Sequence, residues 1–404
     1  MRRLVGLLLL LLLLAPAASS ASERRDYLWQ CVAITRDDAR FSCYTRLLLE
    51  RVESSGDPAR ELPRIDREVR QIGGEVAGGC HGLMHEVGRR YGRAHRITLL
   101  NLRRYIPRSS DPTCSAGFGM GLVMYLGPEL VRTGGRSALA QCARLPTRMR
   151  EYTCVHGLGH ALMRGYHGQL KAAVRACRAL GPDGVDCAQG AFHDYWISLR
   201  GADGTTRPTG AAMSPRRLCD GRLTYVRPCW YRYFIEQKFG TVLNTADDIR
   251  RACHGLRPMQ RSGCIGGASL MLVRLLEPVD HARVCGRLTR KDAVNCLRGV
   301  NVPALAGDRY AQLRLLRTCT AQPDSTRNQC YAWFGRTLNV VTNGRFVRSG
   351  CERLRVSSAR AACVAGARRS QATRSRRAGR GSRRGPRPLR SRTRRQPVAP
   401  ARGR

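Results

Sequence analysis

The sequence predicts an all-α protein, a right-handed solenoid of αα-hairpin repeats of about 34 residues, each stapled by a disulfide. The repeat is visible in the cysteines, which from Cys142 onward fall into seven pairs whose members are separated by 10 to 12 positions. A helical pattern precedes the first cysteine of each pair, and a glycine often follows the second one by three positions. Self-similarity at this period is typical of stacked supersecondary units.

Each unit is expected to contain two helices joined by a polar loop. An apolar residue lies three or four positions before the first cysteine, as Val174 does before Cys177, which places both on one helix face. Thr245 and Asp248 supply an N-cap signal for one of the first helices. We expect each first helix to end at its cysteine and the second helix to begin at the other. The glycine that follows predicts close backbone approach between packed helices.

The cysteine spacing also predicts connectivity. A bridge across one hairpin closes a loop of about a dozen residues, worth roughly 3 kcal/mol in the chain-entropy model. Cys80 and Cys114 lie one repeat period apart, and we expect them to join neighbouring repeats; two free thiols or a metal-bound pair are the alternatives. The predicted bonds are Cys31–Cys43, Cys80–Cys114, Cys142–Cys154, Cys177–Cys187, Cys219–Cys229, Cys253–Cys264, Cys285–Cys296, Cys319–Cys330 and Cys351–Cys363.

The rhythm in which a glycine follows the second cysteine, as in Cys154-Val-His-Gly-Leu-Gly, resembles that of the cysteine-rich Sel1-like repeat proteins. Those proteins staple successive αα-units with one disulfide each. The likeness covers residues 136–366, and the Ala- and Tyr-rich consensus of Sel1 repeats is missing from it. The resemblance implies a curved helical solenoid and a binding role, and it implies no catalytic residues.

The amino-terminal residues predict export. Arg2 and Arg3 precede the apolar stretch 4–15, and small residues follow as far as Ala21, which is the order of a secretory signal. The stretch is shorter than the roughly 20 apolar residues of a spanning helix, and an uncleaved anchor is the alternative. Because 18 cysteines also favour an oxidising compartment, we expect a secreted or otherwise extracytoplasmic protein with no transmembrane segment after cleavage.

These patterns divide the chain into five segments. We expect a signal peptide at 1–21, an N-terminal helical segment at 22–79, His-containing αα-repeats at 80–200, disulfide-stapled αα-repeats at 201–366 and a disordered Arg-rich tail at 367–404. The tail contains no acidic residue and almost no apolar ones, so it has too little to bury for a folded core.

The net charge of +42 limits the partners. Only three of the 71 basic residues are lysines, a skew that a GC-rich genome would produce through its arginine codons. Such a surface attracts polyanions in general. The tail carries neither interleaved aromatic residues nor a nucleic-acid-binding module. We therefore expect a protein partner or an anionic surface or polyanion, and no specific nucleic acid.

The histidines concentrate in the early repeats. Two stretches, His81-Gly-Leu-Met-His85 and His156-Gly-Leu-Gly-His160, place histidines at i and i+4 on one helix face, where they can share a metal ion. Aligning the second helices puts Met120 and His193 in the same column as His85 and His160, whereas the later units carry Ile235, Leu270, Val302 and Arg336 there. The candidate metal ligands are His81, His85, His156, His160, His193 and Met120; Glu86 and Asp194, which follow column histidines, are candidates to orient an imidazole or act as a base.

Imidazole ligands suit zinc, copper or iron, and a methionine among them would favour copper. Adjacent helices lie roughly 8–10 Å apart, so a straight stack cannot gather four repeats around one ion. His85 and His160 come from units two steps apart and would need tight curvature to meet. The alternative is that these histidines donate to neighbouring carbonyls and only pack.

Two classes of function follow from this reading. One is an exported binding or scaffolding module with a His-lined metal site in its early repeats. The other is a metal-dependent hydrolase or oxidoreductase with the same cluster as its active site. The sequence names no reaction, and it contains no phosphate loop, dinucleotide fingerprint or nucleophile elbow. An enzyme predicts that His85, His156, His160 and His193 converge within a few ångströms in a pocket, whereas a scaffold leaves them scattered or capped by carbonyls.

Overall fold

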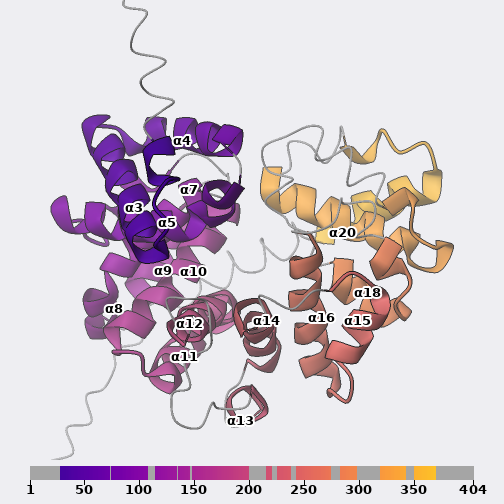
Figure 1. Ribbon diagram of the computed structural model, residues 1–404. Coiled ribbons are helices and arrows are strands. Elements are labelled where there is room, and N and C mark those ends of the chain that lie inside the picture. Colours follow the sequence, from indigo (N-terminus) through magenta and orange to yellow (C-terminus); the bar gives the residue numbers. More distant parts are fainter. Residues whose placement is uncertain are drawn as a thin grey trace, which may run out of the picture.

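The computed structural model describes residues 28–72, 74–107, 114–133, 135–145, 148–199, 215–220, 225–237, 243–273, 283–297, 319–342 and 350–369. Throughout these ranges the regular structure is helical and no strand occurs (Figure 1). The all-α prediction is therefore confirmed for this part of the chain. The expected signal peptide, the tail beyond residue 369 and the helix expected immediately before Cys319 lie outside the described residues.

The helices alternate between longer and shorter ones over much of the chain. The N-terminal part contains η1 (Trp29–Cys31), α3 (Asp37–Ser54), α4 (Pro58–Ile72), α5 (Gly74–Ala94), α6 (Leu102–Tyr105), α7 (Cys114–Tyr125) and α8 (Gly127–Thr133). The next are α9 (Arg136–Ala143), α10 (Arg148–Gly165), α11 (Leu170–Arg178), η2 (Gly181–Asp183) and α12 (Gly184–Ser198). The last are α13 (Pro215–Cys219), α14 (Val226–Gln237), α15 (Ala246–Ala252), α16 (Pro258–Val273), α18 (Arg290–Leu297) and α20 (Asp324–Thr342).

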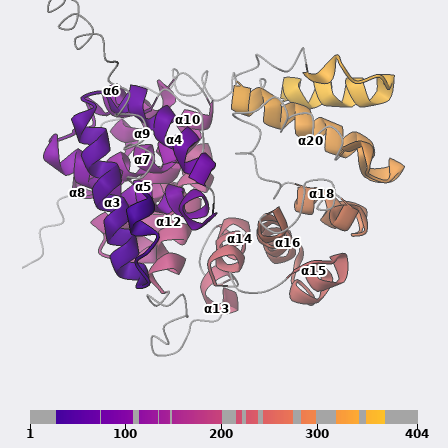
Figure 2. The ribbon, with the colours of Figure 1, turned by 45° about the horizontal axis from the view of Figure 1, so that its top comes forward.

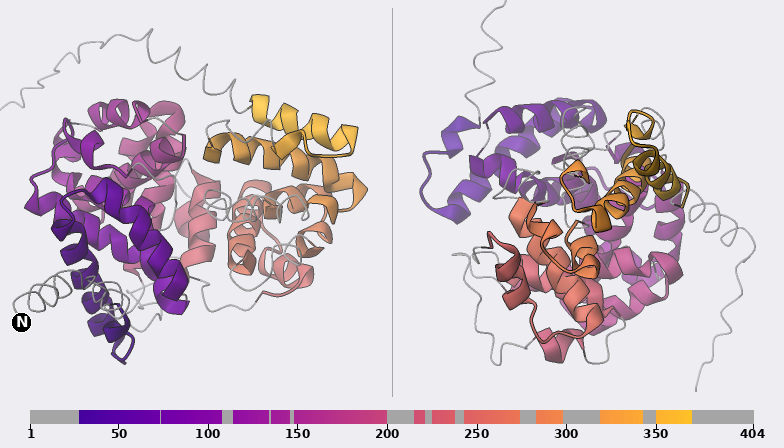
Figure 3. Two further views of the ribbon diagram at one scale, coloured as in Figure 1. Left: turned by 90° about the horizontal axis from the view of Figure 1, so that it is seen from above. Right: turned by 90° about the vertical axis from the view of Figure 1, so that its right-hand side faces the viewer.

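The longer helices pack on one another in chain order. Contacts run from α5 to α7, α10, α12, α14, α16, α18 and α20 in succession, and α10 also meets α20. Two groups of helices result, α3 to α12 and α15 to α20, with α14 between them (Figures 1 and 2). The buried apolar residues form two clusters that divide at the same place, between Trp230 and Phe234 of α14. Figure 3 shows both groups from two further directions.

All eighteen cysteines are bonded, and none is free. Eight bonds close short segments of 10 to 12 residues, and Cys80–Cys114 spans 34 residues and joins α5 to the start of α7. The bonds are Cys31–Cys43, Cys80–Cys114, Cys142–Cys154, Cys177–Cys187, Cys219–Cys229, Cys253–Cys264, Cys285–Cys296, Cys319–Cys330 and Cys351–Cys363. The regular spacing of disulfides along a helical chain is therefore a property of the structure.

The expectation that the second cysteine opens its helix is wrong. Helix α10 begins at Arg148 and helix α16 at Pro258, in each case before the cysteine of that helix. The two Cα atoms of a bridge are 5.5 Å apart at Cys154 and 5.8 Å apart at Cys264, so the second cysteine must face the end of the first helix. A side chain one to two turns inside the returning helix meets that requirement, as do Cys187 of α12 and Cys154 of α10.

Glycines permit direct backbone contact between the long helices. A Cβ at Gly117 of α7 would lie 2.2 Å from the carbonyl oxygen of His81, and one at Gly190 of α12 would lie 2.0 Å from that of His156. Both separations are far inside van der Waals contact, so no other residue fits there without moving a helix. These glycines follow a second cysteine by three positions, and the predicted close approach is confirmed.

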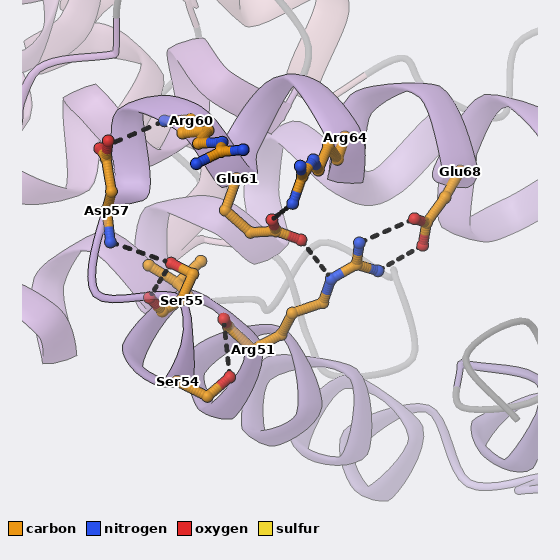
Figure 4. A network of polar contacts seen from close by, with 9 residues as sticks. Arg51, Ser54, Ser55, Asp57, Arg60, Glu61, Arg64 and Glu68 are labelled. Atoms are coloured by element: carbon orange, nitrogen blue, oxygen red, sulfur yellow. Dashed lines mark hydrogen bonds and ion pairs between the residues drawn. The ribbon is translucent and has the colours of Figure 1, made fainter. Parts of the chain in front are cut away.

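Polar contacts hold the N-terminal helices against one another and against α7. Arg51 of α3 donates to Glu61 and Glu68 of α4, with N···O distances of 2.7 Å to each (Figure 4). Asp66 of α4 is 1% exposed and accepts from the backbone N–H groups of Cys114 and Ser115 at 2.9 and 3.2 Å. An acid from one helix thus caps the N-terminus of another, which holds α7 in place next to α5.

Within the described ranges no single helix is long and apolar enough to cross a membrane. Helices α7 and α8 pass that test only as a pair that bends by 56°. Helix α7 is buried in the core and packs on both α5 and α10.

Candidate metal centre

Five histidines meet where α5, α10 and α12 face one another. They are His81 and His85 on α5, His156 and His160 on α10, and His193 on α12. The ring of His160 lies centrally, with its centroid 5.0 Å from that of His85, 5.1 Å from that of His156 and 4.9 Å from that of His193. The cluster therefore joins units that are far apart in the sequence.

The glycine contacts explain why the rings can meet. Gly121 of α7 lies against the carbonyl of His85, and Gly159 of α10 lies against the carbonyl of Cys187 on α12, at 2.2 and 1.9 Å from an added Cβ. Each contact brings two helices closer than side-chain packing would allow. The row consequently curves tightly enough for His85 and His160, which lie two units apart, to touch.

Three of the histidines form a compact group of potential ligands. His156, His160 and His193 each offer a ring nitrogen, and these nitrogens all lie within 4.8 Å of one another. His156 and His160 are each 1% exposed, so the group is shielded from solvent on the α10 side. Tetrahedral zinc and copper sites commonly use three such imidazoles.

Two carboxylates orient the imidazoles of this group. Asp194 Oδ1 lies 3.3 Å from His160 Nδ1, and Glu236 Oε1 of α14 lies 3.3 Å from His193 Nε2. A metal-ligating histidine normally donates its other ring N–H to such an acceptor, which fixes the tautomer and the ring orientation. The arrangement leaves His160 Nε2 and His193 Nδ1 available as ligand atoms.

Buried ring nitrogens in the group lack protein partners. Within the described part of the chain, His160 Nε2 and His156 Nδ1 are buried and make no hydrogen bond. A buried polar atom without a partner costs about 1–3 kcal/mol. The alternative in which these histidines cap carbonyls does not account for the free nitrogen of His160. A ligand to that nitrogen would remove the cost.

Burial favours the neutral form of three of these histidine rings. Burial lowers the pKa of His85, His156 and His193 well below the ordinary histidine value. The nearby charge of Arg232 is the next cause for His156 and His193, and that of His81 is the next for His85. Because a metal binds the unprotonated imidazole, neutral rings at pH 7 are the form that coordination needs.

Arg232 of α14 brings a positive charge to the edge of the group. Its Nη2 lies 3.4 Å from His156 Nε2, and its Nη1 lies 3.6 Å from Glu236 Oε1. A guanidinium opposes the binding of a cation, and the Glu236 carboxylate beside it offsets that charge. Glu236 is only 7% exposed at its side chain, so this compensation acts at short range with little screening.

The other residues singled out by sequence lie elsewhere or serve other contacts. Met120 is buried on α7, where its Cα lies 3.3 Å from the position of a Cβ on Gly157. Glu86 accepts hydrogen bonds from Arg89 and Arg90 of its own helix, at 2.8 Å each. The carboxylate of Glu86 therefore pairs with arginines of its own helix α5. The contacts that orient the imidazoles come from Asp194 and from a second acid that the sequence analysis did not identify.

That missed acid is Glu236, and the sequence contained a signal for it. Asp194 follows His193, and Glu236 follows Ile235, which occupies the next position of the same column. Isoleucine is no metal ligand, so the candidate ligands in this column stop at His193. Reading the following column would have placed Glu236 one unit beyond Asp194 on the same helix face.

Comparisons with known proteins offer no assignment. No family model matches the chain, and neither a curated protein nor a solved structure does. The resemblance to Sel1-like repeats therefore rests on the cysteine rhythm alone.

Proposed function

We propose that this protein is an extracytoplasmic, disulfide-stapled helical scaffold that binds a transition metal ion through His156, His160 and His193. The observation that carries the proposal is the convergence of three imidazoles, two buried and one partly buried, with ligand atoms within 4.8 Å of one another. Scattered histidines would have favoured a purely structural role. Nine intramolecular disulfides support an oxidising compartment, in which such bonds persist.

The same helices serve as the scaffold. The packing of the long helices in chain order supports a right-handed solenoid of hairpin repeats, with its irregular early units holding the ion. A net charge of +42 supports a protein or an anionic surface as the partner. Binding to anionic vesicles should then weaken as salt rises, and salt-independent binding would contradict an electrostatic partner.

Each residue has a defined part in the metal site. His160 and His193 bind through the nitrogens that face away from Asp194 and Glu236, and these carboxylates hold the rings in orientation. His156 supplies the third nitrogen from the helix face of His160. Zinc, copper and iron all suit this donor set, and a bound ion would polarise or activate a small ligand next to it.

A metal-dependent hydrolase or oxidoreductase is the second candidate. Structural zinc sites are usually closed by four protein ligands, whereas catalytic sites use three and keep one position for water or substrate. The compact group contains three histidines, which favours the open type. The carboxylates of Asp194 and Glu236 would then hold the ligating imidazoles in orientation and raise their basicity.

Metal analysis of the full chain, purified without a histidine tag, tests the proposal. We expect at least one zinc or copper ion per chain, and a rise in melting temperature when the stripped protein is reloaded. An ion present at 100 times its Kd stabilises by about 2.7 kcal/mol. His160→Gln should abolish the rise, and His254→Gln, at an exposed histidine outside the cluster, should retain it.

The proposal would be overturned by a wild-type chain that holds no stoichiometric metal and melts at the same temperature with and without added zinc or copper. A rise that persists in His160→Gln would also contradict the assigned ligand.

A further inference from the structure

His81 and His85 form a second pair of imidazoles beside the three-histidine group. They lie one turn apart on α5, and their Nε2 atoms are 3.1 Å from each other. Two nitrogens bound to one tetrahedral ion at about 2.0–2.1 Å are separated by roughly 3.3 Å. The pair therefore already has nearly the spacing that coordination by two imidazoles requires.

This pair adjoins the first site without merging into it. The His85 ring centroid is 5.0 Å from that of His160 and 6.3 Å from that of His193. The compact ligand group includes His156, His160 and His193 and does not extend to α5. His81 is in contact with His85 on the same helix, with their ring centroids 4.7 Å apart.

We propose that the five histidines form a two-ion centre, in which His81 and His85 bind a second transition metal ion next to the ion of His156, His160 and His193. This inference rests on the proposed function, because the second ion adjoins the first. Two-metal sites place their ions about 3.5–4 Å apart, a distance that neighbouring imidazole rings in contact can accommodate.

The charge balance favours a bridging anion. Two divalent ions bring four positive charges, and the orienting carboxylates of Asp194 and Glu236 supply two negative ones. Arg232 adds a further positive charge at the edge of the site. A hydroxide or other small anion between the ions would lower their mutual repulsion and occupy one open position of each. With only two protein ligands, the second ion binds more weakly than the first.

A shared hydrogen bond is the competing explanation of the α5 pair. One neutral imidazole can donate to the other at 3.1 Å, and this needs a single proton and no metal. The two explanations differ in stoichiometry, since a hydrogen-bonded pair takes up no ion. They also differ in magnetism, because only the two-ion centre places copper ions close enough to couple.

The test titrates the stripped full chain with Zn²⁺ and, separately, with Cu²⁺. We expect two ions per chain in the wild type, one in His81→Gln and one in His85→Gln, and two in the surface control His254→Gln. In the copper-loaded wild type, the electron paramagnetic resonance intensity should fall below that of two isolated ions, and His81→Gln should give the full signal of one. This spectrum is independent of how stable each variant is.

Each other outcome overturns a defined part of the argument. One ion in the wild type that persists in His81→Gln refutes the two-ion centre and leaves the proposed function intact. One ion that is lost in His81→Gln refutes it too, because a single ion then spans both groups. No ion in any chain refutes both proposals together.

Discussion

Replacing Gly190 by alanine tests whether backbone contact between α10 and α12 holds the histidines in register. The added methyl group would lie 2.0 Å from the carbonyl oxygen of His156, and ordinary contact begins at 3.4 Å. Relief requires a shift of about 1.4 Å, the difference between these distances, because the obstacle is backbone and cannot rotate away. That shift moves His156 relative to His193, whose facing nitrogens are 3.5 Å apart.

The expected effects on stability and on binding have separate causes. Overpacking of this kind costs about 1–3 kcal/mol, while replacing a helical glycine by alanine returns at most about 1 kcal/mol. A net loss of about 1–2 kcal/mol lowers the melting temperature by roughly 2–8 °C. Metal–ligand distances tolerate only about 0.2 Å, so Gly190→Ala should also weaken metal binding by at least about tenfold.

The matched control is Gly82→Ala on α5, between His81 and His85. No atom lies within 4 Å of a Cβ at Gly82, so this alanine should leave binding unchanged and stabilise the helix by up to about 1 kcal/mol. Thermal melts and competition with a chromophoric chelator measure both effects. If Gly190→Ala matches Gly82→Ala in stability and affinity, the contact does not position the site.

Three further predictions concern acid, a buried cap and the disulfides. Burial lowers the pKa of His85, His156 and His193, so below pH 6.5 the unfolded chain binds more protons than the folded one. The free energy of unfolding of the metal-free protein should therefore fall by up to about 1.4 kcal/mol per histidine for each pH unit below 6.5, down to the folded pKa. A melting temperature that is equal at pH 7 and pH 5 would contradict this. Asp66→Ala leaves two backbone N–H groups at the start of α7 without their acceptor and should cost about 1–3 kcal/mol in urea unfolding, whereas Asp66→Asn should cost less. Reduction removes loop constraints worth roughly 3 kcal/mol each, so far-ultraviolet circular dichroism should show loss of helix, and retention of the full signal would show that packing alone suffices.

The fold was predictable from the sequence to the extent that local chemistry determines it. Cysteine spacing indicated the disulfide pairs, and Thr245 and Asp248 form the capping box that begins α15. Helix starts were less accessible, because α10 begins before its cysteine for reasons of bridge geometry. Which face of each helix meets its neighbour depends on backbone contacts such as that at Gly190, and a sequence pattern reveals only the glycine.

The candidate site was predictable in its members and not in its shape. All five imidazoles were identified, four of them from the two HGxxH stretches and His193 from its aligned position. Their convergence depends on how each long helix is placed against the next. No single sequence motif encodes these placements. Glu236 and Arg232 enter from α14, two helices along from α10, and their role emerges only when this placement brings them to His193 and His156.

The disulfides have a consequence for how the chain can acquire its bonds. Every bond joins two cysteines that follow one another along the chain, with no other cysteine between them, and this includes the longer Cys80–Cys114. A chain that enters an oxidising compartment amino terminus first presents each cysteine just before its native partner. Short loops close at the lowest entropic cost, so the first available pairing is also the correct one. Oxidation in order of emergence would spare this protein the reshuffling of wrong bonds, which otherwise takes from seconds to hours.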